Sequence, residues 1–208
     1  MWLGVGIVVV VGLGAWVAGS AWIKRGVAEP PFDRIATDGE VEVRRYGETI
    51  VAATEVEGER EEALNEGFRR LAGYIFGKNR SRGKIAMTAP VSAVRSEKIA
   101  MTAPVSAVDL REGAFRVTFA MPAGYTLGSL PVPDDPRVLL EVLPGRDVAA
   151  IRFRGWAGRE AIEEHTAALL RWASARGRDV EGSPVLAQYD PPFAMPLMRR
   201  NEILLNLR

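Results

Sequence analysis

The stretch VEVRRYGETIVAATEV, residues 41–56, alternates apolar and polar side chains on both sides of Gly47. Alternation with a period of two is typical of a strand that presents one face to a core. A glycine between two such runs is typical of a turn. The stretch therefore predicts two strands, Val41–Tyr46 and Thr49–Val56, that pair with each other as a hairpin.

A helix is expected directly after these strands. In GEREEALNEGFRRLAGYIFG, residues 58–77, the apolar residues Leu64, Phe68, Leu71 and Ile75 recur at the spacing of one helix face. Gly77 is a natural end for that helix. The first half of the chain therefore begins with two strands and a helix.

The second half repeats this order. VLLEVLPGRDVAAIRFRG, residues 138–155, predicts two strands on either side of a Pro-Gly pair. Residues 157–177 then predict a helix with Ile162, Leu169 and Trp172 on one face.

Two more strands, Val185–Tyr189 and Glu202–Leu207, complete the second half. Both halves thus have the order strand, strand, helix, strand, strand, if two strands also follow the first helix. The sequence predicts an α+β fold: a distorted antiparallel β-barrel or open sheet built from two similar ββαββ halves, with a helix on each side.

A segment of the first half is duplicated. Lys84–Val94 recurs without change as Lys98–Val108 after three intervening residues. Two strand-like runs with so short a connection predict a hairpin whose apolar face carries Met87 and Met101. Two interpretations stay open: the hairpin extends the sheet, or its methionines line a ligand site.

Composition excludes several classes of function. The chain has no cysteine, one histidine (His165), and 27 basic against 26 acidic residues, a net charge of +1. Thiolate chemistry and multi-histidine metal sites are therefore excluded, and no basic stripe predicts nucleic-acid binding. Since no arrangement of acid, base and nucleophile stands out, the sequence favours a protein that is not an enzyme.

The N-terminus predicts a membrane anchor. Residues 2–23 hold no charged residue over 22 positions, a helix length of about 33 Å at ~1.5 Å per residue. A cleaved signal peptide is the alternative, although a basic n-region is missing. Lys24 and Arg25 weakly favour a cytoplasmic domain, and a periplasmic one stays open. The expected organisation is an anchor at 1–23, a tether at 24–40 and one domain at 41–208.

Several motifs together resemble the SOUL haem-binding family. GKIAMTAPV at residues 83–91 and YDPPFAMPLMRRNEILLNL at residues 189–207 are the most specific, and the resemblance extends from about Phe32 to Arg208. Bacterial members look similar in doubling the KIAMTAPV segment. The resemblance implies a distorted β-barrel with two helices and a shallow apolar groove beside the first helix that binds haem or another tetrapyrrole.

The resemblance also implies contact residues. The family's haem-contact helix matches residues 68–72, where Phe68 and Leu71 would face the macrocycle and Arg69 or Arg70 would pair with propionates. The competing interpretation places Phe68 and Leu71 in the core. The full set of candidate ligand contacts is Phe68, Arg69, Arg70, Leu71, Ala72, Met87 and Met101.

Axial ligation of the iron is the weakest part of the resemblance. Some family members are thought to use a histidine in or before the first helix, and this sequence has none there. His165, on the second helix, is the candidate metal ligand; the alternative is a boundary residue with a satisfied hydrogen bond.

The functional expectation is a membrane-tethered haem- or tetrapyrrole-binding protein that buffers or carries its ligand without catalysis. Its partners would be the tetrapyrrole and, through residues 2–23, the lipid bilayer. The alternatives are a binding module for another hydrophobic anion and a protein-interaction module.

Overall fold

The computed structural model describes residues 27–81, 96–190 and 194–208. The expected anchor, residues 1–23, and the first copy of the duplicated segment, with Met87, lie outside the described residues. Among the residues that the structure describes, no helix combines the length and the apolar character needed to cross a bilayer.

Strands and helices follow one another in nearly the expected order. The elements are β1 (Phe32–Asp38), β2 (Val41–Tyr46), β3 (Thr49–Glu57), α2 (Arg60–Ile75), β4 (Asn79–Arg80), β5 (Val105–Arg111), β6 (Ala114–Ala120), β7 (Val132–Pro133), β8 (Leu139–Leu143), β9 (Arg146–Arg154), α3 (Arg159–Ala175), β10 (Val180–Gln188), the 3-10 turn η2 (Pro196–Met198) and β11 (Arg200–Leu207).

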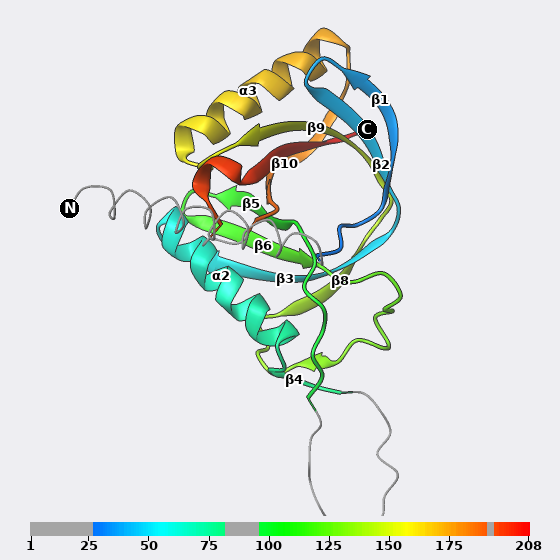
Figure 1. Cartoon of the computed structure of the whole chain (residues 1–208), viewed down its shortest axis with the longest axis vertical. Coiled ribbons are helices and arrows are strands. Elements are labelled where there is room, and N and C mark those ends of the chain that lie inside the picture. The colour runs from blue at the N-terminus through cyan, green and yellow to red at the C-terminus, as the bar shows by residue number, and fades with distance from the viewer. Residues whose placement is uncertain (1–26, 82–95, 191–193) are drawn as a thin grey trace, which may run out of the picture.

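Nine of these strands form one curled antiparallel sheet in the order β1-β2-β9-β11-β10-β5-β6-β3-β8, as Figure 1 shows. Strands β4 and β7 pair separately. The two halves, β2-β3-α2-β5-β6 and β8-β9-α3-β10-β11, have the same order of elements. The α+β class, the curled antiparallel sheet and the two ββαββ halves are therefore confirmed.

Both helices pack on one face of the sheet, here called the outer face. Leu186, which lies in the core under α3, pairs with Ala107, and Ala107 pairs with Val117, which lies in the core under α2. Side chains of directly paired residues point to the same face of a sheet. Helix α2 covers β3 and β6, and α3 covers β9 and β11. The expectation of a helix on each side therefore fits the curled sheet as an open barrel but not as a flat sheet with one helix on each face, and the inner face has no helix among the described residues.

The predicted hairpin of Val41–Tyr46 with Thr49–Val56 is also wrong, although both strands exist. Strand β2 pairs with β1 and β9, whereas β3 pairs with β6 and β8. Alternation reports which face is buried but not which strand is the neighbour. The links 47–48 and 144–145 pass close to each other, because a Cβ on Gly145 would lie 3.3 Å from the carbonyl oxygen of Tyr46.

The sheet begins earlier than expected. Phe32–Asp38, placed in the tether by sequence, forms β1 and pairs antiparallel with β2. Most of its side chains are exposed at the edge of the sheet, so it lacks the apolar alternation that identifies a strand.

The second copy of the duplicated segment is only partly a strand. Val105–Val108 begins β5, directly after Pro104, and is paired on one side with β6 and on the other with β10. Both edges of these four residues are occupied, so they cannot form the predicted hairpin with the first copy. Residues 98–104 lie outside the regular strands, and Ile99 is buried in the core under α2.

The helix stripes read from the sequence are confirmed as core. In α2, Leu71 and Ile75 are buried, and Leu64 and Phe68 pack against the same core. In α3, Leu169 is buried, and its neighbours Ile162 and Trp172 are partly buried. The close approach of α2 to β6 needs a glycine, since a Cβ on Gly67 would lie 2.6 Å from Cγ2 of Val117.

The inner face carries a buried ion network. The Arg44 guanidinium, on β2, donates to Glu202, on β11, with Nη1 to Oε2 at 2.6 Å and Nη2 to Oε1 at 3.2 Å. Arg152 and Arg200 also donate to Glu202, at 3.1 and 2.9 Å, and the Tyr189 hydroxyl donates at 2.8 Å. Arg44 and Glu202 are nearly inaccessible to solvent.

This network lowers the pKa of the glutamate. Burial pushes the pKa of Glu202 upward, but the hydrogen bonds and positive charges of Arg44 and Arg200 outweigh it and hold the pKa at about 2. Burial, together with the neighbouring Glu202 carboxylate, raises the pKa of the Tyr189 hydroxyl. Glu202 is therefore ionised and Tyr189 neutral at neutral pH.

Removal of Glu202 is expected to destabilise the fold more than removal of Arg44. Glu202→Gln leaves three arginines without their shared carboxylate and should cost about 3–5 kcal/mol of unfolding free energy at pH 7. Arg44→Met leaves Glu202 with Arg152 and Arg200 and should cost less. Denaturant unfolding followed by circular dichroism measures both, and an equal or larger loss for Arg44→Met would contradict this assignment.

The same network predicts how the free energy of unfolding falls at acidic pH. Because the folded pKa of Glu202, about 2, lies below the ordinary 4.5, its stabilisation is complete above pH 4.5 and is lost as pH falls toward 2. The stability difference between wild type and Glu202→Gln should shrink across that range. A difference that stays constant to pH 2 would contradict the assignment.

Two glycines of α2 should respond oppositely to alanine. Gly67→Ala should destabilise by about 1–3 kcal/mol through overpacking against Val117, although alanine favours helix by about 1 kcal/mol. Gly67→Ala with Val117→Ala should recover part of the loss. Gly73→Ala meets only the flexible Lys78 side chain, at 3.1 Å, and should be neutral or stabilising. Thermal unfolding of the three variants tests this, and two equal single-variant effects would refute it.

Candidate functional site

A groove of about 610 Å³ runs beside the C-terminal half of α2. One wall comes from α2 and the turn after it, and the other comes from residues 133–138, which lead from β7 to β8. We call it the α2 groove; α2 and its turn contribute Glu66, Arg69, Arg70, Tyr74 and Lys78.

Hydrogen bonds hold the two walls together. The buried Tyr74 hydroxyl donates to the carbonyl of Pro131 at 3.0 Å. The backbone N–H of Asp134 donates to the carbonyl of Lys78 at 3.2 Å. Tyr74 and Val138 are both buried, so the groove has an apolar floor beneath a rim of charged side chains.

The two α2 arginines that line the groove, Arg69 and Arg70, differ in how firmly their side chains are held. Arg70 is nearly buried: its Nη1 donates to Thr54 Oγ1 at 2.7 Å and to the carbonyl of Glu55 at 3.0 Å. Its Nε has no hydrogen bond and lies 3.7 Å from a carboxylate oxygen of Asp135. The Arg69 side chain is 72% exposed, forms an ion pair with Glu66 at 3.1 Å and donates from Nε to the carbonyl of Asn65 at 3.4 Å. Arg69 can therefore reorient toward a ligand, whereas Arg70 is fixed.

The opposite rim carries a fork-shaped ion pair. The Arg137 guanidinium donates to both oxygens of Asp135, at 2.9 and 2.7 Å. This hydrogen-bonded pair holds the pKa of the Asp135 carboxyl at about 2. Lys78 is exposed, and within the described part of the chain no carboxylate lies in ion-pair range of its ammonium group. Lys78 is thus the rim cation most available to an anionic ligand.

The sequence of the domain matches a known family over nearly its whole length. The family model described as SOUL heme-binding protein matches residues 27–206. This chain belongs to the SOUL family.

Similar proteins of known name support the same assignment. Heme-binding protein 1 of Xenopus laevis is 31% identical over 168 residues, which cover 78% of this chain and 80% of that protein. Heme-binding protein 2 of Mus musculus is 29% identical over 178 residues, covering 84% and 82%.

Solved structures show how widely the fold occurs. The C-terminal domain of EcmrR has a TM-score of 0.57 at 11% identity, covering 81% of this chain and 96% of that one. An uncharacterized conserved protein from Listeria innocua has a TM-score of 0.53 at 14% identity, covering 83% and 94%. At such low identity these likenesses show the fold alone.

The expected SOUL contact residues separate into two groups. Arg69 and Arg70 line the α2 groove. Phe68, Leu71, Ala72 and Met101 instead pack against the core under α2, where the Phe68 ring lies 5.4 Å from that of Phe119. Leu71 is fully buried, so in this structure it cannot touch a ligand in the groove.

Sequence reasoning missed half of the groove. Lys78 and residues 133–138 follow α2 and β7 and have no periodic pattern of their own. The signal that could have found them is PVPDDPRV, residues 131–138, where prolines separate the acidic pair from Arg137. Such a segment is a rigid surface turn, and rigid turns commonly carry binding residues.

His165 lies on α3, away from the α2 groove. Its ring stacks on Phe153 with 4.3 Å between centroids, and its Nδ1 is 2.7 Å from the carbonyl oxygen of Ala161, one helical turn earlier. Among the described residues no group of three His, Cys, Asp or Glu side chains could hold a metal ion. Axial ligation by His165 stays a prediction.

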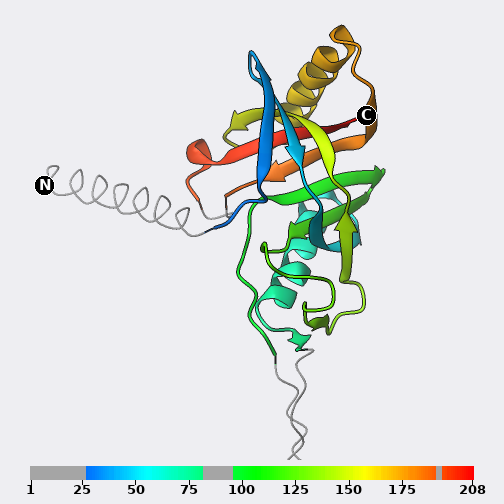
Figure 2. The same ribbon diagram turned by 90° about the vertical axis from the view of Figure 1, so that its right-hand side faces the viewer.

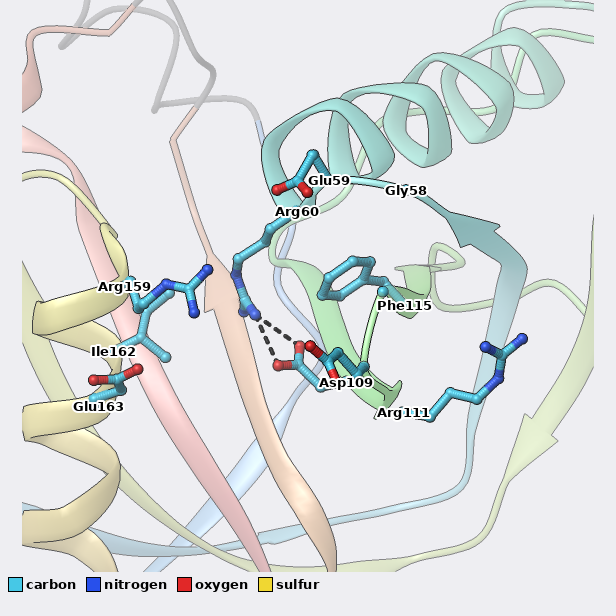
Figure 3. A pocket seen from close by; sticks show the side chains of 11 residues that line it. Gly58, Glu59, Arg60, Asp109, Arg111, Phe115, Arg159, Ile162 and Glu163 are labelled. Atoms are coloured by element: carbon cyan, nitrogen blue, oxygen red, sulfur yellow. Dashed lines mark hydrogen bonds and ion pairs between the residues drawn. The ribbon is translucent and has the colours of Figure 1, made fainter.

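A second hollow, of about 360 Å³, lies between the first turns of α2 and α3 (Figure 3). The Arg60 guanidinium bridges it and donates to both oxygens of Asp109, at 2.9 and 2.8 Å. Its lining holds three arginines (Arg60, Arg111, Arg159) and four carboxylates (Glu59, Asp109, Glu112, Glu163). Since acids outnumber bases there, this hollow suits an anionic ligand less well than the α2 groove.

Proposed function

We propose that this SOUL protein binds haem or a related tetrapyrrole in the α2 groove and carries or buffers it without catalysis, tethered to a bilayer by residues 2–23. The observation that carries the proposal is the groove itself, which lies beside the first helix and has an apolar floor and a rim where four basic side chains outnumber three carboxylates. Membership of the SOUL family and similarity to two heme-binding proteins support haem as the ligand.

The residues of the groove fit an amphipathic macrocycle. Its volume of about 610 Å³ lies inside the usual range of small-molecule sites, about 300–1,000 Å³. Pro133 and Pro136, which are accessible above the buried floor of Tyr74 and Val138, would contact one face of the ring. Lys78, Arg69 and Arg137 would hold the propionates. Arg70 would contribute positive charge without reorienting toward the ligand, because its guanidinium is held by hydrogen bonds to Thr54 and to the carbonyl of Glu55.

The residues of the groove predict that the iron contributes little to the affinity for haem. Among the described residues, its lining has no histidine or methionine, and the Tyr74 hydroxyl donates to a backbone carbonyl. Binding would rest on burial of the ring and on the propionates rather than on an axial bond. Haem is then cargo, and the groove residues bind and orient it without a bond-making step.

The same feature supports a second candidate, a metal-free hydrophobic anion such as a pigment or a lipid acid. A groove without an axial ligand does not discriminate strongly for iron. A protein-interaction role through strand addition at Val105–Val108 is disfavoured, because both edges of that segment are already paired.

Haem titration of the full chain, followed by absorbance and corrected for a detergent blank, tests the proposal. One haem per chain is expected to bind, and Lys78→Glu should weaken binding by about three- to tenfold, as for the loss of one exposed ion pair. Arg178→Glu, an equal charge reversal at the exposed end of α3, is the matched control and should change little. Equal losses for both variants would contradict the groove.

A variant that is expected to bind haem more tightly separates an effect on the groove from a loss of binding caused by misfolding. Asp135→Asn should release Arg137 from its ion pair and tighten haem binding, while the Asn oxygen can still accept the backbone N–H of Arg137. Metal-free protoporphyrin should bind about as tightly as haem, and His165→Ala should leave both affinities unchanged. Loss of binding in His165→Ala would instead make that histidine the ligand.

A further inference from the structure

The two most exposed large apolar side chains of the described chain are Leu197, 79% exposed, and Trp156, 67% exposed. Isolated surface leucines are common, but a neighbouring leucine and tryptophan left open to water mark an interaction surface. Neither lines the α2 groove.

Backbone hydrogen bonds bring these two residues to one edge of the sheet. Trp156 follows the end of β9, and Leu197 lies in η2 directly before the antiparallel partner β11. The N–H of Gly155 donates to the carbonyl of Arg199 at 3.2 Å, and the Asn201 amide donates to the carbonyl of Gly155 at 3.0 Å. The segments that carry Trp156 and Leu197 therefore lie side by side at this edge of the sheet.

Arginines lie beside this surface, of which Arg200 is paired with Glu29 and Glu202. The Arg199 guanidinium lies 4.5 Å from the centroid of the Trp156 ring. Arg154, also exposed, faces Arg200 across the β9–β11 ladder. A tryptophan beside arginines suits the interface between lipid headgroups and acyl chains, where each nearby cation gains roughly 1 kcal/mol on an anionic surface.

The described chain begins at the same edge. The Glu29 carboxylate pairs with Arg200 at 2.8 Å, and the carbonyl of Ala28 accepts from Ala103. Figure 2 shows the start of the described chain on the same side of the molecule as the turn before β11. Ile23, the last residue of the uncharged segment, is four residues before Val27, so at ~3.8 Å per residue their Cα atoms are at most about 15 Å apart.

We propose that Trp156 and Leu197 form a membrane-docking patch that seats the domain on the bilayer in one orientation. The proposal rests on the tether of the proposed function and adds a second, independent contact with lipid. The short connection limits how far the patch can lie from the bilayer, and its sequence contains two cations, Lys24 and Arg25. Burial of the two side chains in the headgroup region, with the nearby arginines, then supplies the contact.

The absence of cysteine from the chain makes a site-specific test possible. The full chain carrying Leu197→Cys, labelled with an environment-sensitive fluorophore, is reconstituted into vesicles of phosphatidylcholine and phosphatidylglycerol. We expect a blue-shifted emission that nitroxide-labelled lipids quench. The matched control is Leu110→Cys, 48% exposed at the far end of β5, whose label should stay in water and unquenched.

Each of three other outcomes would contradict the docking proposal, and each can be told from the others. An aqueous, unquenched label at position 197 on a chain that floats with the vesicles means a tether without docking. A blue shift without lipid quenching, or one that disappears when unlabelled chain is added, means that a second copy or another protein covers the surface. A chain that does not float with the vesicles would contradict attachment to the membrane by residues 2–23. Haem titration tests binding in the α2 groove independently of this result.

Discussion

The buried carboxylate of Glu202 is the constraint on which the shared sheet depends. It lies on β11, in the second half of the chain, and its nearly inaccessible partner Arg44 lies on β2, in the first half. Strand β9 separates β2 from β11, so the ion pair spans three strands of the sheet. A charge this deeply buried tolerates few alternative partners, and we infer that it sets which strands of the two halves become neighbours.

That arrangement positions the binding surface. Because the ion network occupies the inner face, both helices pack on the outer face over apolar side chains. Gly67 lets α2 approach β6 closely, and the segment after β7 then lies against the exposed side of the helix. The α2 groove thus forms between a helix fixed by core packing and a proline-rich turn fixed by hydrogen bonds, which makes it a preformed site.

The sequence predicted the local elements well and their partners poorly. Alternation located β2, and the apolar stripes located α2 and α3, because each pattern reports which side of an element is buried. The β2–β3 hairpin failed because pairing is decided by contacts such as Arg44 with Glu202, 158 positions apart in the chain. At the site, the resemblance indicated Arg69 and Arg70, whereas Lys78 and Arg137 join them only through tertiary structure.

The most direct test of the account locates the ligand on the domain. Ferric haem is paramagnetic and broadens the amide signals of nearby residues in the nuclear magnetic resonance spectrum of the isotope-labelled chain. Tetrapyrrole binding in the α2 groove predicts broadening of Gly73–Lys78 and of Asp134, Asp135, Arg137 and Val138, with the signals of α3 unaffected. Broadening centred on Tyr46 and Tyr189 of the inner face, or on His165, would contradict the account.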